Sequence, residues 1–369
     1  MLLPSYFLAT LYQESAMLQS LRERVNVTDV FMWIVGSILV LIIVVGSIAT
    51  LVKGTYNDRQ WFDFVVFGIA QGSIYALIAL GYTLVYGILR MINFAHSEVF
   101  MSGPFTAYFV ADGMYKSGFL EANPIIGLAV IFLVSMAISV GVALLLERIA
   151  YRPLRNAPRL VPLITAIGAS LFLQYVFRGL YGPGLKAYPE LTILAGAIDF
   201  GPYKVLKVHI LVIIAAAALM ALMYYVVQRT KIGKAMRAVS EDRETALLMG
   251  IDVDRIIVAT FVMGGALAGA AGVLYALVFR QVSFSMGFIP GIKAFTAAVL
   301  GGIGNVPGAM LGGLFLGLFE SVGPSLFLDG LGIPAPYQLK DVIAFTMLVL
   351  VLIFRPSGIL GERLGAKKA

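Results

Sequence analysis

Long apolar runs without any charged residue constrain this chain more than any other feature. Residues 30–52 read VFMWIVGSILVLIIVVGSIATLV, with no charge between Asp29 and Lys53. Residues 125–146 form another uninterrupted apolar run. A helix of about 20 apolar residues crosses a bilayer, and 60% of the 369 residues are hydrophobic while only 13% are charged. The chain is therefore predicted to be an all-α integral membrane protein, a polytopic bundle of about eight to ten transmembrane helices.

The stretch at residues 81–103, GYTLVYGILRMINFAHSEVFMSG, places polar groups inside this apolar background. An ionisable side chain costs about 2.5 kcal/mol or more at mid-membrane depth, so such groups usually line a cavity or a subunit contact. On one ideal helix Asn93 and His96 share a face, whereas Glu98 lies about 200° away from His96. The two ionisable groups can therefore meet only if the helix breaks, which Gly87 and its neighbouring glycines permit.

A structural interpretation of the same residues stays open. His96 and Glu98 could simply begin a helix near the membrane interface, where an acid is favourable at the helix N-terminus. The combination of polar groups, glycines and apolar flanks favours a transport pathway instead. The candidate pathway residues, all of them polar and within apolar segments, are Gln71, Tyr82, Asn93, His96, Glu98 and Asn305.

A second glycine-rich interruption, GGIGNVPG, lies at residues 301–308. The apolar segment before it, 294–300, would be only about 10 Å long as a helix and could not cross a bilayer alone. We therefore expect discontinuous or re-entrant helices both here and near 87–103. One break in each half is typical of transporters built from related repeats, with the path near the midplane. An internal repeat is thus a further prediction.

Basic residues are concentrated in short connections, and these predict the orientation of the chain. The loop ERIAYRPLRNAPR at 147–159 is rich in arginine and marks the cytoplasmic side. The Gly- and Pro-rich segment 179–207 is interpreted as an external connection, and the basic residues at 361–369 place the C-terminus in the cytoplasm. Because these loops account for the net charge of +7, nucleic acid is not an expected partner.

The charged segment at residues 228–255 is predicted to contain a short cytoplasmic helix at about 241–249. Ser240 suits the N-cap position, acidic residues suit the first turn, and Gly250 suits the C′ position just after the helix. The apolar residues of this helix would be exposed unless they dock on a partner; the alternative is a helix lying on the membrane or on its own bundle. The residues assigned to this docking helix are Ser240, Glu241, Asp242, Glu244, Ala246, Leu247 and Gly250.

Several chemistries are disfavoured by the sequence. Cysteine is absent and the two histidines form no HExxH motif, so neither a thiolate metal site nor a zinc-hydrolase site is expected. No GxxxxGK[ST] motif occurs, so the chain has no nucleotide-binding loop of its own. A protease using Ser97 and His96 is disfavoured, since adjacent helical residues point about 100° apart. A proton-coupled secondary transporter using Glu98 and Glu320 remains a rival.

Several segments closely resemble the LivH-type family of branched-chain amino acid ABC transporter permeases, and the resemblance covers about residues 61–359. The NFAH–E and AVLGGIGNVPGA motifs are specific to this permease superfamily, although urea and amide permeases share relatives of them. The resembling segments are GSIYALIALGYTLVYGILRMINFAHSEVFMSG at 72–103, AYRPLRNAPRLVPLITAIGASLFLQ at 150–174, AVSEDRETALLMGIDVDRIIVATFVMGGALAGAAGVLYAL at 238–277 and GFIPGIKAFTAAVLGGIGNVPGAMLGGLFLGLFE at 287–320.

This resemblance implies a non-catalytic permease subunit in a bacterial-type inner membrane. It would pair with a second similar permease, two cytoplasmic ATPase subunits and a periplasmic substrate-binding protein. ATP would be used by the partner subunits, and no cofactor is expected in this chain. Residues 240–250 resemble the coupling helix of ABC importers, whereas Asn93, His96 and Glu98 match the family signature without fixed roles. Branched-chain amino acids are the expected cargo, with urea or short amides as the alternative.

Two departures from the family pattern accompany the resemblance. Ser97 stands where a glycine is expected, which would loosen a close backbone contact. Residues 1–58 have no counterpart in the typical member, so they are assigned as an N-terminal extension with an extra transmembrane helix at 30–52. Residues 59–360 are assigned as the permease domain and 361–369 as a cytoplasmic tail.

Overall fold

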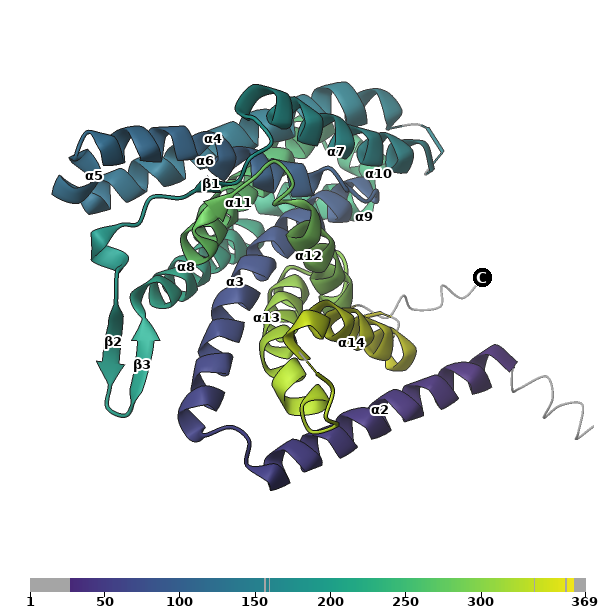
Figure 1. Ribbon diagram of the computed structural model, residues 1–369. Coiled ribbons are helices and arrows are strands. Elements are labelled where there is room, and N and C mark those ends of the chain that lie inside the picture. Colours follow the sequence, from purple (N-terminus) through teal and green to yellow (C-terminus); the bar gives the residue numbers. More distant parts are fainter. Residues whose placement is uncertain (1–26, 156, 159, 335, 356, 362–369) are drawn as a thin grey trace, which may run out of the picture.

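The computed structural model describes residues 27–155, 157–158, 160–334, 336–355 and 357–361. Helices dominate the described chain (Figure 1). The α-helices are α2 (Val27–Lys53), α3 (Asp58–Leu89), α4 (His96–Lys116), α5 (Phe119–Ala122), α6 (Pro124–Leu146), α7 (Leu160–Tyr181), α8 (Lys207–Arg229), α9 (Lys231–Glu241), α10 (Arg243–Leu248), α11 (Val253–Phe279), α12 (Phe288–Gly301), α13 (Val306–Gly323) and α14 (Lys340–Phe354).

Short irregular elements join these helices. Two π-helical segments, Glu147–Tyr151 and Pro324–Leu328, extend α6 and α13. The 3-10 turns are Arg152–Leu154, Thr192–Leu194 and Pro336–Leu339, and the strands are β1 (Lys186–Ala187), β2 (Ala197–Phe200), β3 (Tyr203–Leu206) and β4 (Gln281–Val282).

Eight of the described helical segments are long and apolar enough to cross a membrane, which confirms the predicted polytopic all-α bundle. They differ in how much of their surface the protein itself covers. In α3 and α11, 72% and 67% of the apolar window are buried inside the bundle, whereas α2 reaches only 17%. Because most of their apolar surface is covered by the protein, α3 and α11 form the core of the bundle. Apolar side chains that the protein leaves exposed on the other helices suit contact with lipid. The peripheral helices α2, α6, α7, α8 and α14 present exposed apolar surface.

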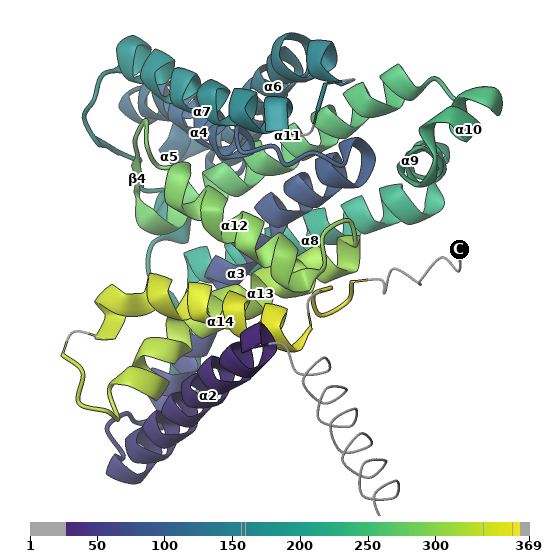
Figure 2. The ribbon, with the colours of Figure 1, turned by 90° about the vertical axis from the view of Figure 1, so that its right-hand side faces the viewer.

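The connections gather on two opposite sides of the bundle. In Figure 2, α9 and α10 lie on the right, while β4 and α5 lie on the left. On the left-hand side, β1 pairs antiparallel with β4 in the register Lys186↔Val282. The hairpin of β2 and β3 belongs to the same connection between α7 and α8, with Ala197 opposite Leu206. This connection falls in the segment 179–207 that the sequence predicts to be external.

Helix α3 crosses α13 at very short distance, and glycines make the crossing possible. A Cβ atom placed on Gly72 would lie 2.9 Å from the Gly313 carbonyl oxygen, and one placed on Gly317 would lie 2.2 Å from the Gly72 Cα. Side-chain-free positions let two helix backbones approach closely in lipid. The small-residue pair that Gly68 and Gly72 form in the sequence therefore packs against α13.

Both predicted breaks exist, but the glycines of the first are not where the chain bends. Helix α3 ends at Leu89 and α4 begins at His96. Gly87 lies within α3 and Gly103 lies within α4, where a Cβ would meet Ser135 and Ser139 of α6. The expectation that these glycines break the helix is therefore wrong at these positions. The second break lies between α12 and α13, where Gly302 and Gly304 have φ of +106° and +94°, values that side chains disfavour.

The predicted cytoplasmic helix begins later than expected. Helix α9 continues to Glu241, so Ser240 and Glu241 belong to its last turn, and Ser240 is not an N-cap. Asp242 caps α10 instead, accepting hydrogen bonds from the backbone amides of Glu244 and Thr245 at 2.9 and 3.2 Å. Asp242 can do this because its backbone is extended between the two helices, as an N-cap requires. Gly250 ends the segment with φ of +81°, as predicted.

The close crossing of α3 and α13 generates a stability prediction. Gly317→Leu should lower the free energy of unfolding by roughly 1–3 kcal/mol or more, because overpacking forces the two backbones apart. Gly141→Leu on α6 is the matched control, since a Cβ there meets nothing within 4 Å. Thermal unfolding of both variants in detergent measures the difference. Equal losses in the two variants would contradict the packing role of Gly317.

Candidate functional site

A buried ion pair and the polar side chains around it join four helices. Lys293 of α12 lies with its Nζ 2.6 Å from Glu320 Oε1 of α13 and 2.6 Å from Asp341 Oδ1 of α14. The side chains of Lys293 and Glu320 are only 3% and 1% exposed. Gln71 of α3 donates a hydrogen bond of 3.0 Å to the same Glu320 oxygen, and its Nε2 lies 2.6 Å from the Tyr75 hydroxyl. Paired charges and satisfied amides are what a buried site in a membrane protein requires.

Glu98 belongs to a second, separate cluster. Its Oε1 accepts hydrogen bonds from Gln174 Nε2 at 2.8 Å and from Ser170 Oγ at 3.1 Å, both on α7, and from Ser97 Oγ at 3.2 Å. The Glu98 side chain is fully buried. The two hydrogen bonds from Ser170 and Gln174 hold α7 against the start of α4, and the bond from Ser97 lies within α4.

His96 lies on a different face of α4 and does not meet Glu98. A Cβ on Gly81 would stand 2.1 Å from His96 Nε2, so only a glycine at that position leaves room for the ring. Tyr82 packs edge-on against the imidazole with the ring centroids 4.9 Å apart. Within the described part of the chain, His96 Nε2 is buried without a hydrogen-bond partner. The break between α3 and α4 therefore folds His96 back onto α3.

Asn93 and Tyr82 line a hollow of about 220 Å³ beside this break. Asn93 accepts a hydrogen bond of 2.7 Å from Tyr151, which belongs to the π-helical segment after α6. The rest of the wall is apolar or aromatic, contributed by α3, the first break, α12 and the second break, where Ile303 lies. Its lining residues are Tyr82, Tyr86, Ile92, Asn93, Phe295, Ala298 and Ile303.

Asn305 serves the second break as a structural residue. Its side-chain oxygen accepts from the Gly308 amide at 2.9 Å and caps α13, and its Nδ2 donates to the Leu360 carbonyl at 2.9 Å. Together with the backbone bond from Ile359 to Leu300, this contact ties the segment after α14 to the end of α12. The tail residues 362–369 lie outside the described residues.

The six predicted pathway residues thus fall into distinct places. Tyr82, His96 and Asn93 come together at the first break, whereas Glu98, Gln71 and Asn305 have partners elsewhere. Their roles in transport stay predictions. Sequence reasoning missed Lys293 and Gln174, although a lysine inside the apolar segment 287–319 is a visible signal.

Ser97, which replaces the expected glycine, sits at a close contact between α4 and α12. A Cβ on Gly291 would lie 2.3 Å from the Ser97 Cβ, and one on Gly287 would lie 2.2 Å from the Ser97 carbonyl oxygen. The glycines of α12 thus provide the space that the serine occupies. Ser97 Oγ donates to the Phe94 carbonyl at 2.8 Å.

Helix α10 presents an apolar surface outside the membrane-spanning helices. Leu247, Leu248 and Met249 are 58%, 87% and 78% exposed, and we call them the α10 apolar patch. Ala246, by contrast, is only 3% exposed. The prediction that it belongs to the exposed face is therefore wrong, because Ala246 packs against its own bundle.

Several arginines lie near the first residue of α10. Arg243 lies at the start of α10, and burial together with the nearby charges of Arg155 and Arg90 holds the pKa of its guanidinium below the usual range. Arg155 itself is ion-paired with Glu147 and Asp254.

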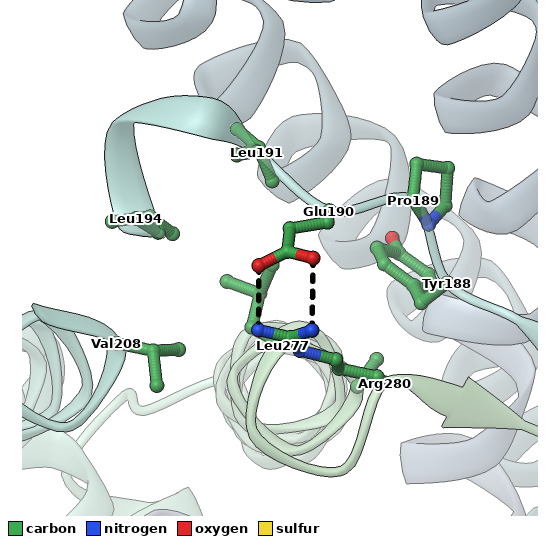
Figure 3. Close-up of a pocket in the computed structure, with 9 residues that line it drawn as sticks. Tyr188, Pro189, Glu190, Leu191, Leu194, Val208, Leu277 and Arg280 are labelled. Carbon is green, nitrogen blue, oxygen red and sulfur yellow. Dashed lines mark hydrogen bonds and ion pairs between the residues drawn. The ribbon is translucent and has the colours of Figure 1, made fainter. Parts of the chain in front are cut away.

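On the opposite side of the bundle, an ion pair closes the connection between α7 and α8 over the end of α11 (Figure 3). Arg280 contacts Glu190 through two hydrogen bonds of 2.8 and 2.6 Å. A hollow of about 290 Å³ lies beside the pair, with an apolar wall that includes Leu191, Leu194 and Leu277. This contact fixes the outer connection to a core helix.

The described residues contain no group of three or more His, Asp or Glu that could hold a metal ion. The geometry offers buried pairs, a glycine-lined crossing, two broken helices and an exposed apolar patch.

Comparison with known proteins identifies relatives over most of the chain. A model of the family described as "Branched-chain amino acid transport system / permease component" matches residues 64–352. The high-affinity branched-chain amino acid transport system permease protein BraD of Pseudomonas aeruginosa is 45% identical over 303 residues, which cover 81% of this chain and 95% of BraD. The corresponding permease protein LivH of Escherichia coli strain K12 is 40% identical and covers 83% of this chain and 96% of its own length.

Structural similarity is weaker. The solved structure of PsaBC from Streptococcus pneumoniae in complex with Fab is 14% identical and covers 83% of this chain and 95% of that chain, with a TM-score of 0.39. A TM-score of this size does not establish a shared fold.

The ion pair between Lys293 and Glu320 generates the next prediction. Lys293→Met should destabilise the protein by roughly 3–5 kcal/mol, because it removes the closest cation from the buried Glu320 carboxylate. The remaining ammonium group, that of Lys340, lies farther away, at 3.8 Å from Glu320 Oε1. The double variant K293M/E320Q should recover most of that loss, since Gln71 can still hydrogen-bond the new amide. Lys204→Met is the control: its ion pair with Asp199 is exposed at 3.5 Å and should contribute less than about 1 kcal/mol. Thermal unfolding in detergent measures all three, and a double variant no more stable than K293M would contradict the pairing.

Proposed function

This chain belongs to the family of branched-chain amino acid transport permeases, and we propose that it is the membrane-spanning permease subunit of an ATP-driven importer of branched-chain amino acids. The single observation that carries this proposal is the similarity to BraD and LivH along nearly their whole lengths. The same similarity favours branched-chain amino acids over the urea or short-amide alternative.

The proposed assembly contains a second, similar permease, two cytoplasmic ATPase subunits and an extracytoplasmic substrate-binding protein, all in a bacterial-type inner membrane. The chain itself is proposed to be non-catalytic, with ATP used by the partner subunits. The segment after α14 lies against the end of α12 through bonds to Leu300 and Gly301. This supports a C-terminus on the side of α9 and α10, which we assign to the cytoplasm.

The α10 apolar patch is the proposed docking point for an ATPase subunit. Three exposed apolar side chains on a polar, extramembrane segment are costly unless a partner covers them. In the assembled importer, movement of the ATPases would displace α10 and, through it, the bundle. The broken segments 90–95 and 302–305 are the places where the helices can change their relative tilt, because the intrahelical hydrogen bonds are already interrupted there.

The hollow lined by Tyr82, Asn93 and Phe295 is the proposed part of the pathway closest to the first break. Its wall is mainly apolar, which suits the side chain of a branched-chain amino acid better than it suits urea. Cargo discrimination is assigned mainly to the binding protein, so this passage needs few polar contacts.

The rival proton-coupled mechanism has weak support in the geometry. It would use Glu98 and Glu320 as proton carriers. Glu320 is paired with Lys293, and Glu98 receives three hydrogen bonds from neighbouring side chains. Both carboxylates therefore have structural partners at Oε1, in two clusters built from different helices, whereas the Oε2 atom of each is buried without a hydrogen-bond partner in the described residues.

Reconstitution tests the proposed function. The subunit, co-purified with its native partners and placed in proteoliposomes, should accumulate radiolabelled leucine only when ATP and the binding protein are supplied. The comparison uses radiolabelled urea under the same conditions, and the subunit alone under a proton gradient. Accumulation by the isolated subunit would refute the dependence on ATPase partners, and a preference for urea would refute the assigned cargo.

The docking assignment makes a separate prediction. Leu248→Glu should abolish co-purification of the ATPase subunits, because it places a charge at the most exposed position of the α10 apolar patch. Leu185→Glu is the control, since Leu185 is 69% exposed on the opposite connection. Affinity purification followed by quantification of the ATPase bands measures both. Unchanged ATPase recovery with L248E would count against this docking surface.

A further inference from the structure

Two arginines link the end of core helix α3 to the junction of α9 and α10 by reciprocal contacts. Arg90 follows α3 and donates from its guanidinium to the Ser240 carbonyl at 2.9 Å. Arg243 begins α10 and donates from its guanidinium to the Ile88 carbonyl at 2.7 Å. Each side chain thus crosses from one segment to the backbone of the other.

The acceptors explain why arginine suits both positions. Ile88 lies in the last turn of α3 and Ser240 in the last turn of α9. The last four carbonyl groups of a helix have no partner within it, and they carry the negative end of the helix dipole. A charged donor satisfies such a carbonyl more strongly than a neutral one. Each arginine therefore caps the C-terminus of a helix.

Arg90 holds this position at a cost to its own backbone. Its φ is +55°, in the left-handed region, where glycine is the usual residue after a helix. A side chain in a sparsely populated backbone region persists when the surroundings enforce it, and such residues cluster at sites that move or bind. Burial lowers the pKa of the Arg243 guanidinium, and the nearby charges of Arg155 and Arg90 lower it further. The chain thus accepts both strain and like-charge repulsion at this junction.

The two linked segments lead to different parts of the protein. From Ser240 and Arg243 the chain continues into α10, whose apolar patch is exposed. From Ile88 and Arg90 it leads into the break that carries Asn93, and back along α3 to Tyr82 beside the hollow. Apart from these arginine contacts, α10 makes its own packing contacts with α9 and α11. Helix α9 also packs against α3. Arg243 therefore links the start of α10 to the end of α3, and Arg90 adds a side-chain link from the end of α3 to the end of α9.

We propose that Arg90 and Arg243 are positioning residues that transmit displacement of α10 to the end of α3 and so to the break beside the hollow. This proposal rests on the proposed function, because it assumes that an ATPase subunit docks on the α10 apolar patch. Loss of either contact would leave the ATPases bound and active, while their movement would no longer reach α3. The defect is an uncoupling of ATP hydrolysis from uptake.

Arg90→Gly is the sharpest test, because glycine relieves the backbone strain while it removes the contact. The complete importer carrying R90G should retain its ATPase subunits and its ATP hydrolysis, while leucine uptake per ATP falls about tenfold, the factor expected when a charge-assisted hydrogen bond is lost. Arg243→Ala should give the same pattern. The control is Arg255→Ala, because the Arg255 side chain is 87% exposed and pairs with Asp252 three residues earlier; its uptake per ATP should be unchanged.

The measurements are ATPase co-purification, ATP hydrolysis and radiolabelled leucine uptake in proteoliposomes that contain the native partners and the binding protein. Uptake per ATP that stays at the wild-type value in R90G would overturn the proposal. Loss of ATPase binding in R90G would also overturn it, because the arginines would then only shape the docking surface. An equal defect in R255A would show a general effect of charge. If the wild-type complex itself takes up no leucine, the proposed function fails instead.

Discussion

The close crossing of α3 and α13 is the constraint on which the rest of the bundle depends. Within lipid, apolar side chains gain little by leaving the solvent, so helices associate through close packing and buried polar contacts. Gly72 and Gly317 let the two backbones touch, and this brings Gln71 within 3.0 Å of Glu320. Glu320 in turn holds Lys293 of α12. A larger residue at the crossing would therefore displace the ionic cluster as well as the two helices.

The polar groups of the bundle mainly join helices that are distant in the sequence. Glu98 binds α7, Asn93 binds the segment after α6, and Asn305 binds the chain after α14. A buried polar group without a partner is costly, so each contact selects one arrangement of the helices over others. Because these polar groups are engaged in contacts between segments, the wall of the hollow beside the first break is mostly apolar. A hollow of this kind is compatible with the apolar cargo of the proposed function.

The helical spans and the second break could be predicted from the sequence, because uncharged length and glycine content are local properties. The first break is expected at glycines that lie inside α3 and α4, so its region could be predicted but not the residues that bend. The partners of the polar residues could not be predicted either. Nothing in the sequence near Glu98 indicates that Gln174 donates a hydrogen bond to it. In the same way, the ion-pair partner of Lys293 is Glu320, which lies on another helix. The start of α10 was misplaced for a different reason. Ser240 and Asp242 are both good cap residues, and the amphipathic run from Lys231 continues through Ser240, so only the backbone geometry distinguishes them. The domain boundary near residue 58 stays a prediction.

The two most buried of the eight long apolar helices end in the same unusual way, at opposite sides of the bundle. Helix α3 is followed by Arg90 and α11 by Arg280, and these are the two non-glycine residues with positive φ in the described chain. Each reaches from a core helix to an adjacent connection, Arg90 to Ser240 and Arg280 to Glu190. Glu190 lies on the connection between the peripheral helices α7 and α8, and Ser240 lies at the end of α9, which follows α8. Each arginine therefore joins a core helix to a segment that is continuous with a peripheral helix. At the end of α3 this contact lies next to the break beside the hollow, which is where the proposed transmission from α10 would act.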